Sequence, residues 1–328
     1  MNDMGELPRA AGGPVGTERH LTCATRIHRA KSRAPWGFSN ALRDPTNLDS
    51  RTLGRASALV TEATRLGFDA LALRVTDVWP LEPGARALIE AARSQRVCLS
   101  LALTSDHGTD TTLGLIDAWI EAGIQVIDVS ETPELSGLVA SLLASSDRGQ
   151  VRSRLVTGPH LSDLDHVLRE DWIEITRSSA ISQPWTPPAL VSLLSAFYGI
   201  HESVGSSPSW DLTPDIVGDE GLSASSRVLA TLALPGTLTV DVGIAADPVV
   251  RGALRFRKEL GLEESSLSVS SRPGLLGLYV GGLVVAVNTG ERTEVEGAGT
   301  VLCSTGCYTD GDRLVLEPGS TTWYERHH

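Results

Sequence analysis

The ten residues AGIQVIDVSE, at positions 122–131, contain the parts of one β/α unit in a single short run. Gly123 is typical of the end of a helix, because glycine readily takes the left-handed conformation that closes the last turn. The apolar residues that follow it indicate a buried strand. The run ends in Asp128, Ser130 and Glu131, which are polar residues at the strand end where barrel enzymes place their chemistry.

The same alternation of short β-rich runs and longer segments of helical period extends over residues 20–262. One of the helices is indicated by Leu113, Ile116 and Ile120, which share a face at helical spacing. Strands that alternate strictly with helices predict a parallel sheet, and eight such units predict a (β/α)8 TIM barrel. The expected strands are 20–27, 70–75, 97–103, 124–130, 154–158, 172–176, 210–213 and 237–242.

The composition changes at both ends of this pattern. Residues 1–19 are polar and rich in glycine and proline, so we expect a flexible segment before the barrel. After residue 262, short β-rich runs separated by glycine turns replace the helical spacing. They predict a small antiparallel domain, resembling a β-sandwich, over residues 263–328.

Charge and hydropathy exclude several classes of protein. The balance of 28 Lys and Arg against 40 Asp and Glu gives a net charge of -12. A negative net charge disfavours sequence-independent binding to the phosphate backbone of nucleic acid. No apolar run reaches the roughly 18 residues that a membrane span needs, and the first residues contain no signal-peptide core. We therefore expect a cytoplasmic protein with no membrane contact.

Cys23, Cys98, Cys303 and Cys307 are too few and too scattered to form a disulfide framework in a chain of this size. The spacing of the last two is weak evidence for a metal site, because no second pair lies near them in the sequence. We expect buried or incidental thiols, no metal and no cofactor.

Five longer motifs occur in the order of a known family. They are LGFDALALRV at 66–75, ALIEAARSQRVCLSLAL at 87–103, SQPWTPPALVSLLSAF at 182–197, RVLATLALPGTLTVDVG at 227–243 and GLLGLYVGGLVVAVNTGE at 274–291. Together they resemble the α-amylase superfamily, glycoside hydrolase family 13, and are most similar to bacterial α-glucosidases. The resemblance covers most of residues 50–326 and implies the same barrel, the same C-terminal β domain and an α-glucoside ligand.

The resemblance fails at the positions that carry catalysis in that family. The nucleophile position is occupied by Ser130, and Asp128 stands where the family has an arginine. The acid/base position falls near Thr157, so Asp215 is the one catalytic carboxylate of three that is retained. A retaining glycosidase needs two carboxyl groups about 5 Å apart. Serine cannot replace one of them without a neighbouring base, and it cannot supply the negative charge.

The loops at the expected mouth of the barrel are short. The segments TDVWPLEPG, at 76–84, and TSDHGTDTT, at 104–112, leave no room for the domain that the family inserts over its sugar cleft. The mouth should therefore be open. Candidates for binding a sugar in loops at this mouth are Asp106, His107, Trp79 and Trp185, although the two polar residues are also explained as solvated loop residues and helix caps.

Three functions remain open. The first is an α-glucosidase-like protein that is catalytically inactive and binds a small sugar or α-glucan, or regulates an unidentified protein partner. The second is an active hydrolase of α-glucosides or other substrates, with a site rebuilt from Asp106, His107, Asp128 and Asp215. The third is a gene product without selected activity, which the intact periodicity of the barrel helices disfavours. We favour the first, because the nucleophile, the acid/base and the inserted domain are all missing.

Overall fold

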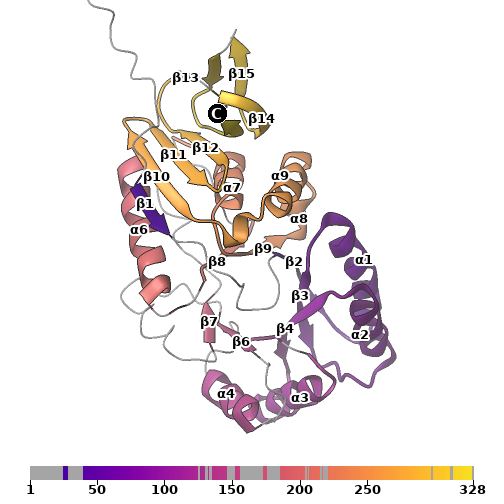
Figure 1. Ribbon diagram of the computed structural model, residues 1–328. Helices are drawn as coiled ribbons and strands as arrows, with labels where there is room; N and C mark the ends of the chain where they lie inside the picture. The colour runs from indigo at the N-terminus through magenta and orange to yellow at the C-terminus, as the bar shows by residue number, and fades with distance from the viewer. Residues whose placement is uncertain are drawn as a thin grey trace, which may run out of the picture.

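The computed structural model describes residues 25–28, 40–124, 126–129, 132, 135–145, 152–155, 173–175, 185–203, 205, 207–214, 216, 221–296, 298–310 and 313–326. The segment expected to be flexible, 1–19, lies outside these residues. The protein is a mixed α/β structure in which a parallel sheet with helices on its outside is followed by two antiparallel sheets (Figure 1).

Eight parallel strands are hydrogen-bonded in the order β7-β6-β5-β4-β3-β2-β9-β8. This is the order in which the strands of a barrel follow one another around its axis. Within the described residues, no hydrogen-bonded pair joins β7 to β8, the two strands at the ends of this order. The strands are β2 Asn40–Leu48, β3 Ala70–Thr76, β4 Cys98–Thr104, β5 Val126–Asp128, β6 Arg152–Leu155, β7 Ile173–Ile175, β8 Ser209–Leu212 and β9 Thr237–Asp241.

The first strand of the parallel sheet is β2, and the prediction that residues 20–27 form it was wrong. The short strand β1, Thr25–His28, instead pairs antiparallel with β10, Leu267–Arg272, in the C-terminal sheet. The sequence does not indicate β2 as a strand, because Pro45 and its polar neighbours are typical of a turn. The pairing of β2 with β3 is indeed irregular between Asp44 and Asn47, so the strand continues through an interruption that sequence rules take as its end.

Helices cover the outer face of the parallel sheet, where Figure 1 shows α1 to α4 along β2 to β6. In α1 the buried residues Ala56, Val60 and Ala63 recur at helical spacing, and Gly67 ends the helix with a φ of 82°. The helices are α1 Ala56–Leu66, α2 Pro83–Gln95, α3 Thr109–Glu121, α4 Ser136–Ser145, α6 Pro187–Ser203, α7 Ala224–Leu232, α8 Val242–Ala245 and α9 Pro248–Glu259, with short 3-10 turns at Leu53–Arg55 and Leu262–Glu264.

The two faces of the parallel sheet differ in chemistry. Leu71, Leu73 and Val75 of β3 belong to the large core beneath the helices, whereas Ala70 of the same strand packs with Ala41 and Val126 in a separate small cluster. Alternation along a strand therefore assigns the small cluster to the inner face. The inner positions that continue this alternation are small or polar, unlike the bulky branched residues that usually fill a barrel: Ala72, Ser100, Ala102, Ser209, Thr237 and Thr239.

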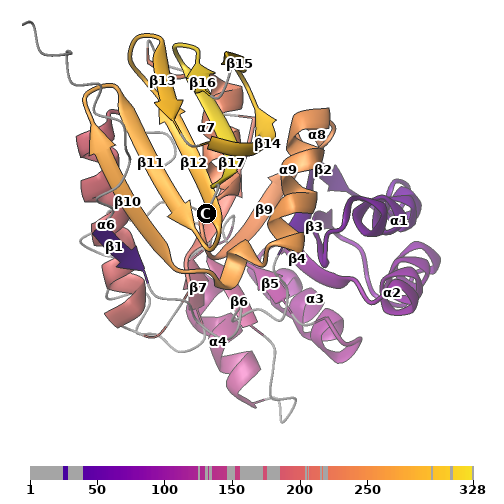
Figure 2. The same ribbon diagram turned by 45° about the horizontal axis from the view of Figure 1, so that its top comes forward.

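The C-terminal part consists of two antiparallel sheets, as the sequence predicts (Figure 2). The first has the strand order β1-β10-β11-β12-β17-β14 and the second β13-β16-β15. One face of the larger sheet packs on α6, α7 and α9, while Val284 and Tyr324 on its other face meet Leu314 and Leu316 of the smaller sheet. The further strands are β11 Leu275–Val280, β12 Leu283–Asn288, β13 Thr293–Glu296, β14 Ala298–Ser304, β15 Cys307–Asp310, β16 Arg313–Leu316 and β17 Ser320–Arg326.

Arg257 of α9 anchors the turn that leads into β9. Its guanidinium is fully buried and donates to the carbonyl oxygens of Leu232 and Leu234 at 2.7 Å each, to that of Gly236, and to Asn40 Oδ1 at 3.3 Å. Burial lowers the pKa of Arg257 to about 10, so the side chain stays charged at neutral pH. One cation thus supplies donors to three buried carbonyl oxygens at the end of α7 and in the turn before β9.

No helix among the described residues is long and apolar enough to cross a membrane.

Candidate functional site

The carboxyl ends of the parallel strands bring polar residues from distant parts of the chain to one edge of the sheet. Asp128 is the last residue of β5 and is half-buried. The other positions aligned with the family's catalytic residues, Ser130, Thr157 and Asp215, lie outside the described residues. The structure therefore places one member of the expected catalytic set, and its separation from Asp215 is not defined.

The clearest polar feature at this edge is a set of three charged residues, Arg43, Asp211 and Asp241, which we call the mouth cluster. Arg43 Nη1 on β2 donates to Asp211 Oδ2 on β8 at 2.9 Å and lies 2.8 Å from Asp211 Oδ1. Arg43 Nε lies 3.9 Å from Asp241 Oδ2 on β9, the strand between them. The side chain of Asp211 has no exposed surface, and that of Arg43 is 18% exposed.

The strand pattern explains why these three side chains meet. Trp210 and Leu212 of β8, and Leu238 and Val240 of β9, belong to the core beneath the helices. The residues that alternate with them, including Asp211 and Asp241, must therefore face inward. Arg43 follows the inward-facing Ala41 by two positions and is paired in register with Asp241, so the three charges converge on the inner face.

Asp241 has a second task in the backbone. It is the N-cap of α8, and its Oδ1 accepts a hydrogen bond from the Gly243 amide at 2.9 Å. Each carboxylate of the mouth cluster thus has one oxygen engaged, Oδ2 of Asp211 by Arg43 Nη1 and Oδ1 of Asp241 by the cap of α8. A buried carboxylate requires such a partner, and neither of the two presents a free pair of oxygens to a substrate.

Asp128 lies at the next register level of the sheet. It is paired in register with Ala102 of β4 and Arg154 of β6, and Arg154 is paired with Glu174 of β7. On the other side, Ala102 is paired with Arg74 of β3, an exposed residue. Asp128 therefore has the arginine position 154 on one side in the register, while Ala102 separates it from Arg74 on the other side.

Asp77 joins the loops that follow β3 and β4. It accepts a hydrogen bond from the Ser105 hydroxyl and one from the Asp106 amide at 3.2 Å, and His107 Nε2 lies 4.0 Å from its Oδ2. The hydrogen bond from Ser105 is the main reason why the pKa of Asp77 is lowered, with the Asp106 amide and His107 adding to it. Asp106 and His107, both expected to bind sugar, are exposed residues of this braced turn.

The two tryptophans expected to bind sugar have opposite environments. Trp79, in the loop after β3, is 44% exposed, and the edge of its ring lies near Gly114 of α3. Trp185 is 4% exposed and belongs to the main hydrophobic core. A buried ring cannot stack on a ligand in solvent, so Trp79 is the one of the two that offers a surface to a sugar.

Sequence reasoning did not identify Arg43, Asp211, Asp241 or Asp77. A signal for the first three was present, because each is a charged residue within an apolar run, in ALRD, SWDL and TVDV. A charge inside a buried strand must be paired or lie at the rim. What the sequence could not show is that the three charges compensate one another, since the pairing of Arg43 with Asp211 joins residues 168 positions apart.

The described residues outside these clusters provide few candidates for metal ligands or for nucleophiles. No group of three or more His, Cys, Asp or Glu side chains within them could hold a metal ion. The described cysteines are free thiols, and burial raises the pKa of Cys98 to about 11 and that of Cys303 to about 12. These two thiols are protonated at neutral pH, which makes them poor nucleophiles.

No protein-family model matches the chain, and no curated protein matches it. Similar folds do occur among solved structures. Amy13B of Eubacterium rectale is 8% identical with a TM-score of 0.56, and the alignment covers 92% of this chain and 98% of that one. A GH27 β-L-arabinopyranosidase of Geobacillus stearothermophilus is 10% identical with a TM-score of 0.55, covering 89% and 97%.

A third similar structure is a putative α-galactosidase of Bacteroides fragilis, 10% identical with a TM-score of 0.54, where the alignment covers 88% of this chain and 79% of that one. Identities this low report the fold alone, and the matched structures do not favour one glycosidase family over another. The fold of the chain is therefore similar to the fold of these three solved structures.

Proposed function

We propose that this protein is a catalytically inactive relative of α-glucosidases that binds a small sugar or an α-glucan at the carboxyl edge of its parallel sheet. The observation that carries the proposal is the mouth cluster. One oxygen of each described carboxylate is already engaged, by Arg43 or by the cap of α8, which supports a site without the free carboxyl pair that a glycosidase uses.

The sequence supports the same conclusion from another direction. Ser130 and Thr157 occupy the nucleophile and acid/base positions implied by the resemblance, and neither has a carboxyl group. Asp128 stands at the position of the family's arginine, two residues before the nucleophile position, so it does not take the nucleophile's place in the sequence. Trp79 supplies an exposed aromatic ring, and such rings suit the apolar face of a sugar.

We also propose that the parallel sheet closes into a complete barrel. The eight strands would form a complete (β/α)8 barrel over residues 20–262 through a contact between β7 and β8, with β1 contributed to the C-terminal domain at 263–328. A cytoplasmic location is part of the same proposal and follows from the expectations drawn from the sequence.

An active hydrolase with a rebuilt site is the second candidate. It is favoured by the position of Asp128, which is half-buried at the carboxyl end of β5, the part of a barrel that carries catalytic groups. Asp215, Asp106 and His107 would complete such a site. This candidate requires turnover that depends on Asp128 and Asp215.

The experiment is a panel of glucose, maltose, trehalose and longer α-glucans, with binding measured by calorimetry and hydrolysis by release of reducing sugar. The proposal expects saturable binding without hydrolysis. Trp79→Ala should weaken binding about tenfold, in line with the loss of a stacking surface. Leu81→Ala, a change at a neighbouring residue that is 73% exposed, should leave it unchanged.

Hydrolysis that disappears in both Asp128→Asn and Asp215→Asn would establish the second candidate and overturn the first. Absence of both binding and hydrolysis across the panel would refute the carbohydrate role altogether.

A further inference from the structure

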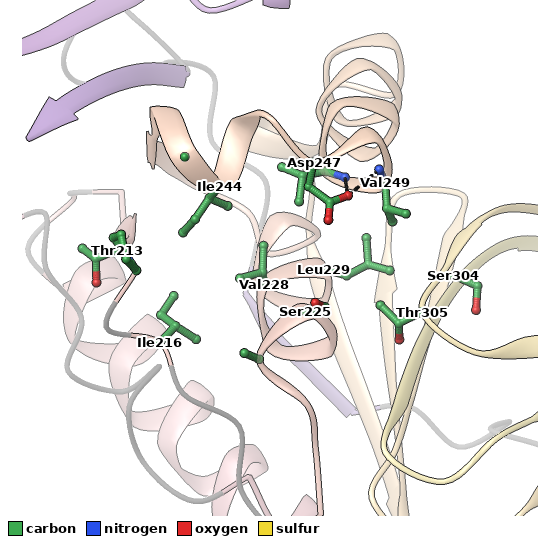
Figure 3. A pocket seen from close by; sticks show the side chains of 14 residues that line it. Thr213, Ile216, Ser225, Val228, Leu229, Ile244, Asp247, Val249, Ser304 and Thr305 are labelled. Atoms are coloured by element: carbon green, nitrogen blue, oxygen red, sulfur yellow. Dashed lines mark hydrogen bonds between the residues drawn. The ribbon is translucent and has the colours of Figure 1, made fainter.

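A pocket of about 440 Å³ lies between α7, α8 and the first turn of α9, with the end of β14 along one side (Figure 3). This volume lies within the range of about 300–1,000 Å³ that is usual for small-molecule sites. Small, aliphatic and hydroxyl-bearing residues make up most of its described lining.

The pocket lies next to the mouth cluster, because the amide of its lining residue Gly243 donates to Asp241, but it does not include the cluster. Its lining includes none of Arg43, Asp211 and Asp241, although it begins at Thr213 and Gly243, two residues beyond the two aspartates. Its floor is built on α7, and its far side is the turn after β14, where the Ser226 and Thr305 hydroxyls are 2.7 Å apart. The two parts of the protein therefore both contribute walls.

The lining has two kinds of surface. Ile216, Val228, Leu229 and Ile244 form an aliphatic side (Figure 3). The polar side consists of hydroxyls and one carboxylate, that of Asp247, whose Oδ1 accepts the amides of Val249 and Val250 at 2.7 and 3.4 Å. Both cap hydrogen bonds go to Oδ1, so the cap does not use Oδ2 of this lining residue.

The composition of the described lining disfavours several ligand classes. The described residues that line the pocket include no lysine, arginine or histidine, so they offer no cation to a phosphate or a carboxylate. They also include no aromatic ring on which a sugar face could stack. The carboxylate of Asp247 is partly compensated by the N-terminal amides of α9 whose hydrogen bonds it accepts, so it offers a ligand a hydrogen-bond acceptor more than an unscreened charge.

We propose that this pocket binds a neutral aliphatic molecule that carries hydroxyl groups on one end. The aliphatic body lies against Val228, Leu229 and Ile244, and the hydroxyls donate to Asp247 and exchange hydrogen bonds with Ser225. Burial of the apolar body provides most of the affinity, and the carboxylate fixes the orientation.

The probe is 1,2-hexanediol, with methyl resonances of isoleucine, leucine and valine followed by NMR in the full-length protein. Saturable shifts are expected for Ile216, Val228 and Ile244 and not for methyls of α1 to α3. Ethylene glycol has the same hydroxyls without the aliphatic body and should produce no saturable shift. Because neither probe is a sugar, the outcome does not depend on whether the mouth binds carbohydrate.

Two variants test the geometry. Ser225→Trp places a large ring in the pocket from an exposed position on the first turn of α7 and should reduce affinity at least tenfold, roughly. Ser94→Trp, at an exposed serine of α2 outside the pocket, is its matched control. Asp247→Asn keeps a good N-cap but removes the charged acceptor, so affinity should fall about fivefold, whereas Asp117→Asn on the exposed face of α3 should have no effect.

The proposal is overturned if the diol produces no saturable shifts, if the shifts lie elsewhere, or if Ser225→Trp binds the diol as tightly as the unmodified protein. Unchanged circular dichroism of each variant confirms that the comparison is between folded proteins.

Discussion

Arg43 on β2 holds Asp211 on β8 across the intervening strand β9, with Nη1 2.9 Å from Oδ2. Since the carboxylate has no exposed surface, removal of its cation leaves a buried charge with weaker compensation. Arg43→Met should therefore lower the free energy of unfolding by about 3 kcal/mol, measured by urea denaturation. In the double variant with Asp211→Asn the cost should be clearly less than the sum of the single costs.

The control for this prediction is Arg65→Met. Arg65 forms an ion pair with Glu62 on the surface of α1, where its side chain is 56% exposed. Arg65→Met should therefore lower the free energy of unfolding by less than about 1 kcal/mol. Equal effects of the two substitutions, or strictly additive effects of Arg43→Met and Asp211→Asn, would show that the mouth cluster does not stabilise the sheet.

Arg257 and Arg255 lie two residues apart on α9 but in opposite environments. Arg257→Met removes the donor to three buried carbonyl oxygens and should cost about 3 kcal/mol of unfolding free energy. Arg255 is 69% exposed, so Arg255→Met should change stability by less than about 0.5 kcal/mol. Thermal and urea unfolding of the pair give the measurement, and a mild effect at Arg257 would contradict the anchoring role.

Gly236 and Gly67 show two different reasons why a position requires glycine: a positive φ, and a lack of space for a Cβ atom. Both have positive φ, 109° and 82°, but a Cβ at Gly236 would lie 2.3 Å from the carbonyl oxygen of Pro208, whereas one at Gly67 would meet no atom within 4 Å. Gly67→Ala should cost about 1 kcal/mol, the price of the left-handed backbone. Gly236→Ala should cost at least about 3 kcal/mol or prevent folding, and similar stabilities of the two variants would rule out the close approach.

The ionisation of Asp77 should make the free energy of unfolding depend on pH in the acidic range. Its pKa is lowered from the usual value of 3.8, chiefly by the Ser105 hydroxyl, so its contribution is present above that value and is lost as the pH falls through the folded-state pKa. Asp77→Asn removes the charge yet suits the φ of 54° at this position. The stability difference between the two proteins should be largest at neutral pH and shrink below about pH 4.

Hydrogen exchange gives a second measurement on the same variant. Loss of the Asp77 brace should increase exchange in the turn around Asp106 and His107, while exchange in α1 stays the same. A stability difference that does not change with pH would mean that the shape of the side chain, and not its charge, holds the turn.

The sequence by itself determined the alternation of strands and helices, the parallel sheet and the antiparallel C-terminal part. These features follow from local hydrophobic period and from glycine and proline stops, which act over a few residues. It also identified Ser130 and Thr157 as residues unsuited to a glycosidase mechanism, because that conclusion depends on side-chain chemistry alone.

Tertiary structure decided which strand begins the parallel sheet and which charges meet inside it. The strand β2 is interrupted around Pro45, where the local sequence predicts a turn. It forms nevertheless, because its residues pair with β9, which lies about 200 residues later in the chain. In the same way Arg43 and Asp211 become one buried pair only because β2, β9 and β8 are neighbours. Contacts between residues far apart in the chain depend on the packing of the whole sheet, and no local pattern specifies them.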